Sequence, residues 1–151
     1  IANASLANQN FRDWLVDSLG QHPELCEKLV FEIEDSALIH HKEQAISFAK
    51  ALIGMKCRVT IEHFGDNLAS LAGLRAIQPH FVKISGKLTK DIHTDQDSQL
   101  FVSSLLSIAR GLSISIIAEL VENEAESVAL TKLNVNFQQG FYFAKPKLWQ
   151  F

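Results

Sequence analysis

The chain has 151 residues, of which 47% are hydrophobic and 21% are charged, a balance that is typical of one folded domain and excludes a disordered tail. Fourteen lysine and arginine residues against seventeen acidic residues give a formal net charge of -3, too little positive charge to hold a nucleic-acid polymer. No apolar run approaches the ~20 residues that span a bilayer, so we expect no membrane insertion by this segment. Cys26 and Cys57 have neither metal-binding nor disulfide-framework spacing and are expected as buried free thiols, which fits a cytoplasmic location, including the cytoplasmic side of a membrane-anchored protein.

Short β-branched or aromatic runs alternate along the chain with stretches that have helical spacing. The strands are predicted at 29–34, 58–62, 81–84, 113–119 and, more weakly, 135–139, and Ile1 is expected to start inside a further strand. Helix faces are predicted at Phe11, Trp14, Leu15 and Leu19, at Ala45, Ala49, Leu52 and Ile53, and at Phe101, Leu105, Ile108 and Leu112. This alternation indicates βαβ units and therefore a largely parallel sheet.

The side-chain alternation within the strands helps to choose between an open doubly wound sheet and a barrel. In 29–34, Glu32 and Glu34 share one face with Val30, so the strand has a polar face. An open sheet covered by helices on both sides would be apolar on both faces, whereas a barrel tolerates inward polar groups at its rim. We therefore expect an α/β fold that is an incomplete (β/α)8 TIM-like barrel, with about six βα units of parallel strands and outer helices. A full barrel needs ~200 to 250 residues, so a strand edge stays open and favours a homodimer or a partner strand.

Polar side chains stand where the predicted strands end. Because parallel strands end at one rim, these groups are expected to converge there. Carboxylates and an asparagine suit Mg²⁺, Mn²⁺ or Ca²⁺, and a lysine among them suits an anionic substrate such as a phosphate ester. The alternative to a functional site is that each charge merely marks where a strand leaves the core. For any single position this alternative is favoured, but it does not explain why all the strands end in such groups. The residues are Asn3, Glu32, Glu34, Glu62, His63, Lys83, Glu119 and Gln139.

Segments in the same order resemble the successive signatures of the EAL domain family. They are Ala-Asn-Ala-Ser at 2–5, Phe-Glu-Ile-Glu-Asp at 31–35, Ile-Glu-His-Phe-Gly at 61–65, Val-Lys-Ile at 82–84, Ile-Ala-Glu-Leu-Val-Glu at 117–122, Gln-Gly-Phe-Tyr-Phe at 139–143, and Pro146. The resemblance implies hydrolysis of the bacterial second messenger cyclic di-GMP or, in degenerate members, binding alone. It makes 1–151 the C-terminal two-thirds of a family domain, without the first portion that carries the Glu-Ala-Leu motif.

The resemblance also implies roles for individual residues. Lys83 and Glu119 take the catalytic positions, and the metal positions fall on Asn3, Glu32, Glu62 and His63. The ligand-binding positions are Asn3, Glu32, Lys83, Glu119, Gln139 and Phe141, although Phe141 is equally well explained by core packing.

The departures from the family pattern bear most on activity. Glu62 and His63 stand where active members have paired aspartates, Asp66 and Asn67 replace the Thr-Gly that follows, and Ser85 replaces an aspartate. An imidazole ligates Mn²⁺ or Zn²⁺ but suits Mg²⁺ poorly.

Three functions remain open from the sequence. The favoured one is a receptor that binds cyclic di-GMP without cleaving it and needs no cofactor. The second is an active phosphodiesterase that depends on Mg²⁺ or Mn²⁺, and the third is a protein-interaction domain that has lost the nucleotide. In each case a homodimer, a protein partner or other domains of a longer chain are expected.

Overall fold

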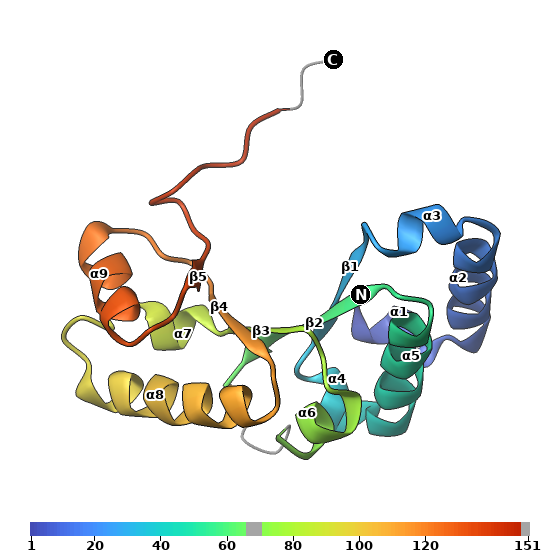
Figure 1. Cartoon of the computed structure of the whole chain (residues 1–151), viewed down its shortest axis with the longest axis horizontal. Coiled ribbons are helices and arrows are strands. Elements are labelled where there is room, and N and C mark those ends of the chain that lie inside the picture. Colours follow the sequence, from blue (N-terminus) through green and yellow to red (C-terminus); the bar gives the residue numbers. More distant parts are fainter. Residues whose placement is uncertain (66–70, 149–151) are drawn as a thin grey trace.

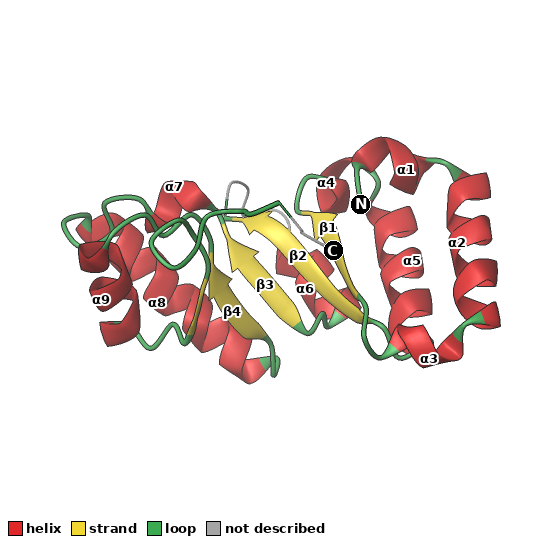
Figure 2. Cartoon of the chain, turned by 90° about the horizontal axis from the view of Figure 1, so that it is seen from above, coloured by secondary structure: helices red, strands yellow, loops and turns green. Residues whose placement is uncertain are grey.

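A five-stranded sheet forms the centre of the fold in the computed structural model, which describes residues 1–65 and 71–148. The strands are β1 (Val30–Glu34), β2 (Arg58–Phe64), β3 (Phe81–Ile84), β4 (Ser115–Ala118) and β5 (Phe137–Gln138). They lie in the order β1-β2-β3-β4-β5, and every neighbouring pair is parallel. All five strands therefore end at one edge of the sheet. Figure 2 shows the arrows of β1 to β4 pointing toward the same side.

Helices connect the strands and are fixed by local caps. The Asn8 side chain accepts from the backbone N–H of Phe11 at the start of α2, Asp95 accepts from Ser98 at the start of α8, and Asn123 accepts from Glu126 at the start of α9. In Figure 1, α4, α6 and α8 lie on one side of the sheet, and the C-terminal segment leaves on the other. The helices are α1 (Asn3–Ala7), α2 (Gln9–Gln21), α3 (Pro23–Cys26), α4 (Ala37–His40), α5 (Lys42–Gly54), α6 (Leu71–Ile77), α7 (Gly86–Thr89), α8 (Gln96–Gly111) and α9 (Glu124–Lys132).

The core lies between the sheet and the helices. Strand residues such as Ile33, Ile61 and Val82 are buried together with Phe48 of α5 and Val102 of α8. Because only one face of each strand meets this core, the other face is left for polar groups near the strand ends. The parallel strands with outer helices that the sequence predicts are confirmed.

Three details of the prediction are wrong. The described residues contain five strands, not about six, and Ile1 is not in a strand. Asn3 does not end a strand but begins α1, because the backbone N–H groups of Ser5 and Leu6 already turn back to the carbonyl of Ala2 at 3.0 and 3.1 Å. The amino group of Ile1 donates to the backbone carbonyl of Glu32, so the chain still enters the fold beside β1.

The two cysteines are free and buried, as predicted. Burial, together with a hydrogen bond to Cys26, raises the pKa of Cys57 to about 11. The thiols are thus neighbours in the core, although 31 positions apart in the chain, and the Cys57 thiol remains protonated at neutral pH. Within the described residues, no helix is long and apolar enough to cross a membrane.

Candidate functional site

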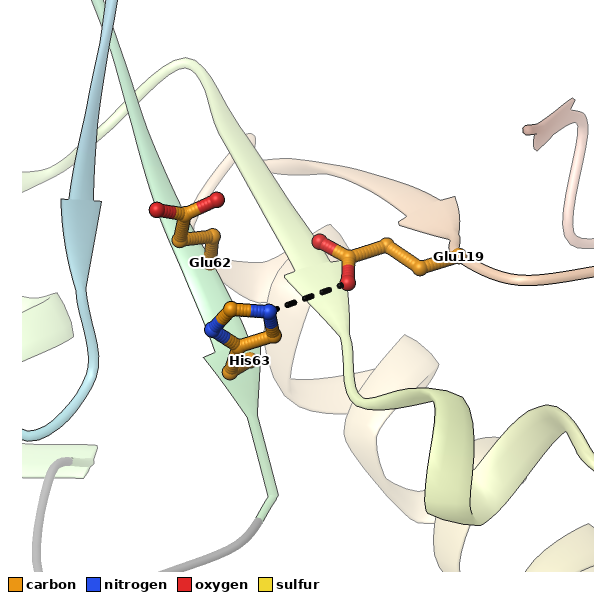
Figure 3. Close-up of side chains that lie close together, drawn as sticks. All are labelled: Glu62, His63 and Glu119. Atoms are coloured by element: carbon orange, nitrogen blue, oxygen red, sulfur yellow. Dashed lines mark ion pairs between the residues drawn. The ribbon is translucent and has the colours of Figure 1, made fainter. Parts of the chain in front are cut away.

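A bulge in β2 builds the first half of the site. Ile61 pairs with Val82 and Phe64 pairs with Ile84, so Glu62 and His63 both lie opposite the single residue Lys83 of β3. His63 has a φ of 57°, a left-handed conformation that one type of bulge contains. The bulge turns the imidazole along the rim, where its Nε2 lies 3.7 Å from Oε2 of Glu119 (Figure 3).

A second bulge lies directly after β4. The backbone N–H of Gln139 donates to the carbonyl of Ala118 at 2.8 Å, and the carbonyl of Gln139 accepts from Val121 at 3.0 Å. Glu119 and Leu120 therefore both lie opposite one residue of the neighbouring segment, and Leu120 has a φ of 55°. A bulge on each side of β3 thus places a glutamate at the rim, Glu62 on the β2 side and Glu119 on the β4 side.

Charged side chains of opposite sign are paired across this rim. Nζ of Lys83 pairs with Oε1 of Glu32, and the lysine side chain is only 13% exposed. Burial raises the pKa of Glu62, and the nearby charge of Glu32 raises it further. Burial also raises the pKa of Glu119, although the charges of His63 and Lys83 oppose this rise. The carboxylates thus share a confined site with two cationic or potentially cationic groups.

Asn3 reaches the rim from helix α1 instead of from a strand. Its Nδ2 donates to Oγ of Ser36 at 2.8 Å, and that hydroxyl donates to Oε2 of Glu34 at 3.1 Å. Oδ1 of Asn3 is buried and has no hydrogen-bond partner among the described residues. Asn3 therefore lies beside the end of β1, although it belongs to helix α1 and not to a strand.

A cavity of about 540 Å³ lies at the carboxyl ends of the strands. The structure brings together in its wall five of the residues that the sequence predicted, Glu62, Lys83, Glu119, Gln139 and Phe141. Asn3, Glu32 and His63 do not line it. Phe141 is 57% exposed and Nζ of Lys145 lies 5.9 Å from its ring centroid, so Phe141 is not a core residue.

The donor set fits one metal ion better than a pair of magnesium ions. Glu62, His63 and Glu119 each offer a ligand atom, and these atoms lie within 4.8 Å of one another. Two carboxylates and an imidazole suit Mn²⁺ or Zn²⁺. Two Mg²⁺ ions ~3.5 to 4 Å apart need denser negative charge, and here Lys83 already neutralises Glu32.

Of the departures from the family pattern after the Glu62–His63 pair, the structure describes only Ser85. Asp66 and Asn67 lie outside the described residues. Ser85 is buried, and its Oγ accepts from the backbone N–H of Lys87 at 3.3 Å, so it caps α7.

A buried carboxylate that the sequence analysis missed holds the second bulge in place. Oε2 of Glu126 accepts from the backbone N–H of Glu122 at 2.8 Å, and Oε1 accepts from that of Asp91 at 3.1 Å. Thr89 adds a hydrogen bond from its hydroxyl to the carbonyl of Glu119 at 2.5 Å. Burial by itself raises the pKa of Glu126, but these backbone donors outweigh it and hold the pKa below its ordinary value.

We expect Glu126→Ala to lower the free energy of unfolding by about 1 to 3 kcal/mol, because it leaves two partly buried N–H groups without an acceptor. Since the folded-state pKa lies below the unfolded one, this stabilisation is complete above the unfolded pKa of ~4.3 and disappears as the pH falls through the folded pKa. Urea denaturation at neutral and acidic pH measures both effects. Glu124→Ala, in the exposed first turn of the same helix, is the control, and an equal loss in both variants would contradict the assignment.

Comparison with known proteins agrees with this geometry. The EAL domain model matches residues 1–146. The cyclic di-GMP phosphodiesterase PdeR of Escherichia coli is 34% identical over 115 residues, which are 76% of this chain and 17% of that protein. The FimX EAL domain of Xanthomonas citri, solved in complex with c-diGMP, superposes with a TM-score of 0.83 at 27% identity and covers 97% of this chain and 57% of that chain. LapD of Vibrio cholerae superposes with a TM-score of 0.87 at 24% identity, over 93% of this chain and 34% of that chain, and shows the fold alone.

The fold is therefore the TIM-barrel-like α/β fold of which these strands form a part, and the predicted fold class is confirmed. The chain belongs to the EAL domain family. It spans about a sixth of the length of the first three curated relatives, 16 to 17%.

Proposed function

We propose that the chain is a cyclic di-GMP-binding signalling domain that acts as a receptor and does not hydrolyse its ligand. The observation that carries this proposal is the pairing of the rim carboxylates with groups of the chain itself, Glu32 with the Lys83 ammonium and Glu119 with the His63 imidazole. A carboxylate that is already paired is a weaker ligand for Mg²⁺, which hydrolysis would use. Binding of a cyclic dinucleotide needs no metal, because lysine and backbone N–H groups can meet its phosphates.

The rim cavity supports a specific arrangement of the ligand. Lys83 is proposed to lie near a phosphate, Glu119 and Gln139 to contact the guanine or ribose edges, and Phe141 to stack on a base. Asn3 and Glu32 are proposed to complete the binding set from the β1 side of the rim.

One observation favours the second candidate, a metal-dependent phosphodiesterase. The cluster of Glu62, His63 and Glu119 could hold one Mn²⁺ or Zn²⁺ ion, which would supply Lewis-acid chemistry to a phosphate ester. In that case Lys83, opposite the bulge, would assist the attacking water. This candidate is the weaker one, because His63 and Glu119 are paired with each other and are therefore less available to a metal ion.

The proposal extends to the assembly and its setting. We propose a cytoplasmic domain that is the C-terminal two-thirds of a complete EAL domain and that forms a homodimer. The described strands do not close on one another, and Phe137 at the end strand β5 is 51% exposed, which supports a second copy at this edge. Sedimentation of the intact protein tests this part, and a stable monomer at micromolar concentration would contradict it.

Calorimetric titration of the intact protein with cyclic di-GMP in the presence of EDTA tests the receptor function. We expect binding in EDTA and no more than a few-fold change when Mn²⁺ replaces the chelator. Binding only with Mn²⁺, together with linear product, would favour the phosphodiesterase. No heat under either condition would refute both and leave the protein-interaction function.

A further inference from the structure

Leu120 has a backbone conformation that its residue type disfavours. Its φ of 55° lies in the left-handed region, where a bulky side chain is rare. Gln78, Ser113 and Asn134 also have positive φ, but each follows the end of a helix, where left-handed residues are common. Leu120 instead lies in the bulge after β4, next to Glu119. Strained residues of this kind gather at functional sites.

The surrounding backbone imposes this conformation on Leu120. Val121 is bonded to Gln139, and Gly140 approaches Val121 so closely that a Cβ on the glycine would lie 2.1 Å from the Val121 carbonyl oxygen. The bond from Glu122 to Glu126 fixes the other side of the bulge. A glycine at position 120 would fit here without strain, so the backbone does not explain why a leucine is present.

Packing within the fold does not explain the leucine either. The side chain lies over Gly86, where an added Cβ would be 2.5 Å from Cδ1 of Leu120, yet the residue is 60% exposed. Leu120 lines the rim cavity together with Phe141, Lys83 and Glu119. An exposed apolar side chain at this place gives the wall an apolar part next to its charged part.

We propose that Leu120 is a specificity-determining residue whose side chain packs on the apolar face of a base or ribose of the bound nucleotide. This inference rests on the proposed function and deepens it. A cyclic dinucleotide offers flat rings and sugar faces next to its phosphates, and the cavity offers Leu120 and Phe141 next to Lys83. Burial of Leu120 by the ligand supplies the apolar contact that the free protein lacks.

The test is Leu120→Gly, examined by calorimetric titration of the intact protein with cyclic di-GMP at several temperatures and at low and high salt. We expect affinity to fall about tenfold, with a less negative heat capacity of binding and a loss that salt does not change, as an apolar contact requires. The melting temperature is expected to rise by about 1 to 4 °C, because glycine relieves the left-handed strain.

Gln78→Gly is the matched control, because Gln78 has a φ of 53° and lies after α6, away from the cavity wall. It should raise the melting temperature in the same way and leave affinity unchanged. If the unsubstituted protein binds but Leu120→Gly keeps affinity within twofold or lowers the melting temperature, only the role of Leu120 is refuted. If the unsubstituted protein does not bind cyclic di-GMP, the proposed function fails, and this inference fails with it.

Discussion

Lys83→Ala is expected to weaken cyclic di-GMP binding by about 1.5 to 3 kcal/mol, which corresponds to roughly ten- to more than a hundredfold in affinity. The lysine lies opposite the Glu62–His63 bulge, is 13% exposed and pairs with Glu32. Its removal leaves Glu32, Glu62 and Glu119 in one confined site without that positive charge. A ligand with two phosphates would then meet repulsion that nothing at the centre of the rim offsets.

Titration calorimetry of the two proteins measures this loss, and Lys50→Ala is the matched control. Lys50 is an exposed residue of α5, so its loss changes the net charge equally without touching the rim. Equal affinities of Lys83→Ala and the unsubstituted protein would contradict the proposed position of the phosphate. A loss of the same size in Lys50→Ala would show that only the overall charge matters.

The double substitution Glu62→Asp with His63→Asp is expected to create Mg²⁺ affinity at least about tenfold above that of the unsubstituted protein. It replaces an imidazole by a carboxylate in a cluster whose donor atoms lie within 4.8 Å of one another. Magnesium prefers hard oxygen ligands and dense negative charge, both of which this change supplies. If Glu62 and His63 alone prevent Mg²⁺-dependent hydrolysis, the double variant should also hydrolyse some cyclic di-GMP.

Titration with Mg²⁺ measures the affinity, and chromatography of the nucleotide measures hydrolysis. His22→Asp is the control, since His22 lies before α3 in an exposed pair with Glu24 and does not line the rim cavity. Unchanged Mg²⁺ affinity of the double variant would mean that His63 is not what excludes the ion.

The positions of most rim residues could be predicted from the sequence, because parallel strands all end at one edge of a sheet and these residues stand at strand ends. Glu62, Lys83 and Glu119 follow from this rule and meet in one cavity wall. The sequence places Asn3 at a strand end because a short polar segment with small residues carries no strong helix signal, whereas the turn at Ala2 is set by backbone hydrogen bonds.

The bulges could not be predicted, since neither has the glycine that usually marks a left-handed position. His63 and Leu120 adopt that conformation because neighbouring backbone bonds force it. The role of Glu126 has a related cause: an acidic residue in the first turn of a helix ordinarily faces solvent, and here it accepts from an N–H of the segment just before its own helix and from one of a distant loop.

The central claim is that this domain binds cyclic di-GMP and leaves it intact, and one measurement tests it most directly. The intact protein is saturated with the nucleotide in the presence of Mg²⁺, binding is recorded by calorimetry, and the nucleotide is then recovered and separated by chromatography. We predict saturable binding and recovery of the cyclic form. Turnover to the linear product at ~1 per second or faster, an ordinary rate for an enzyme, would contradict the account.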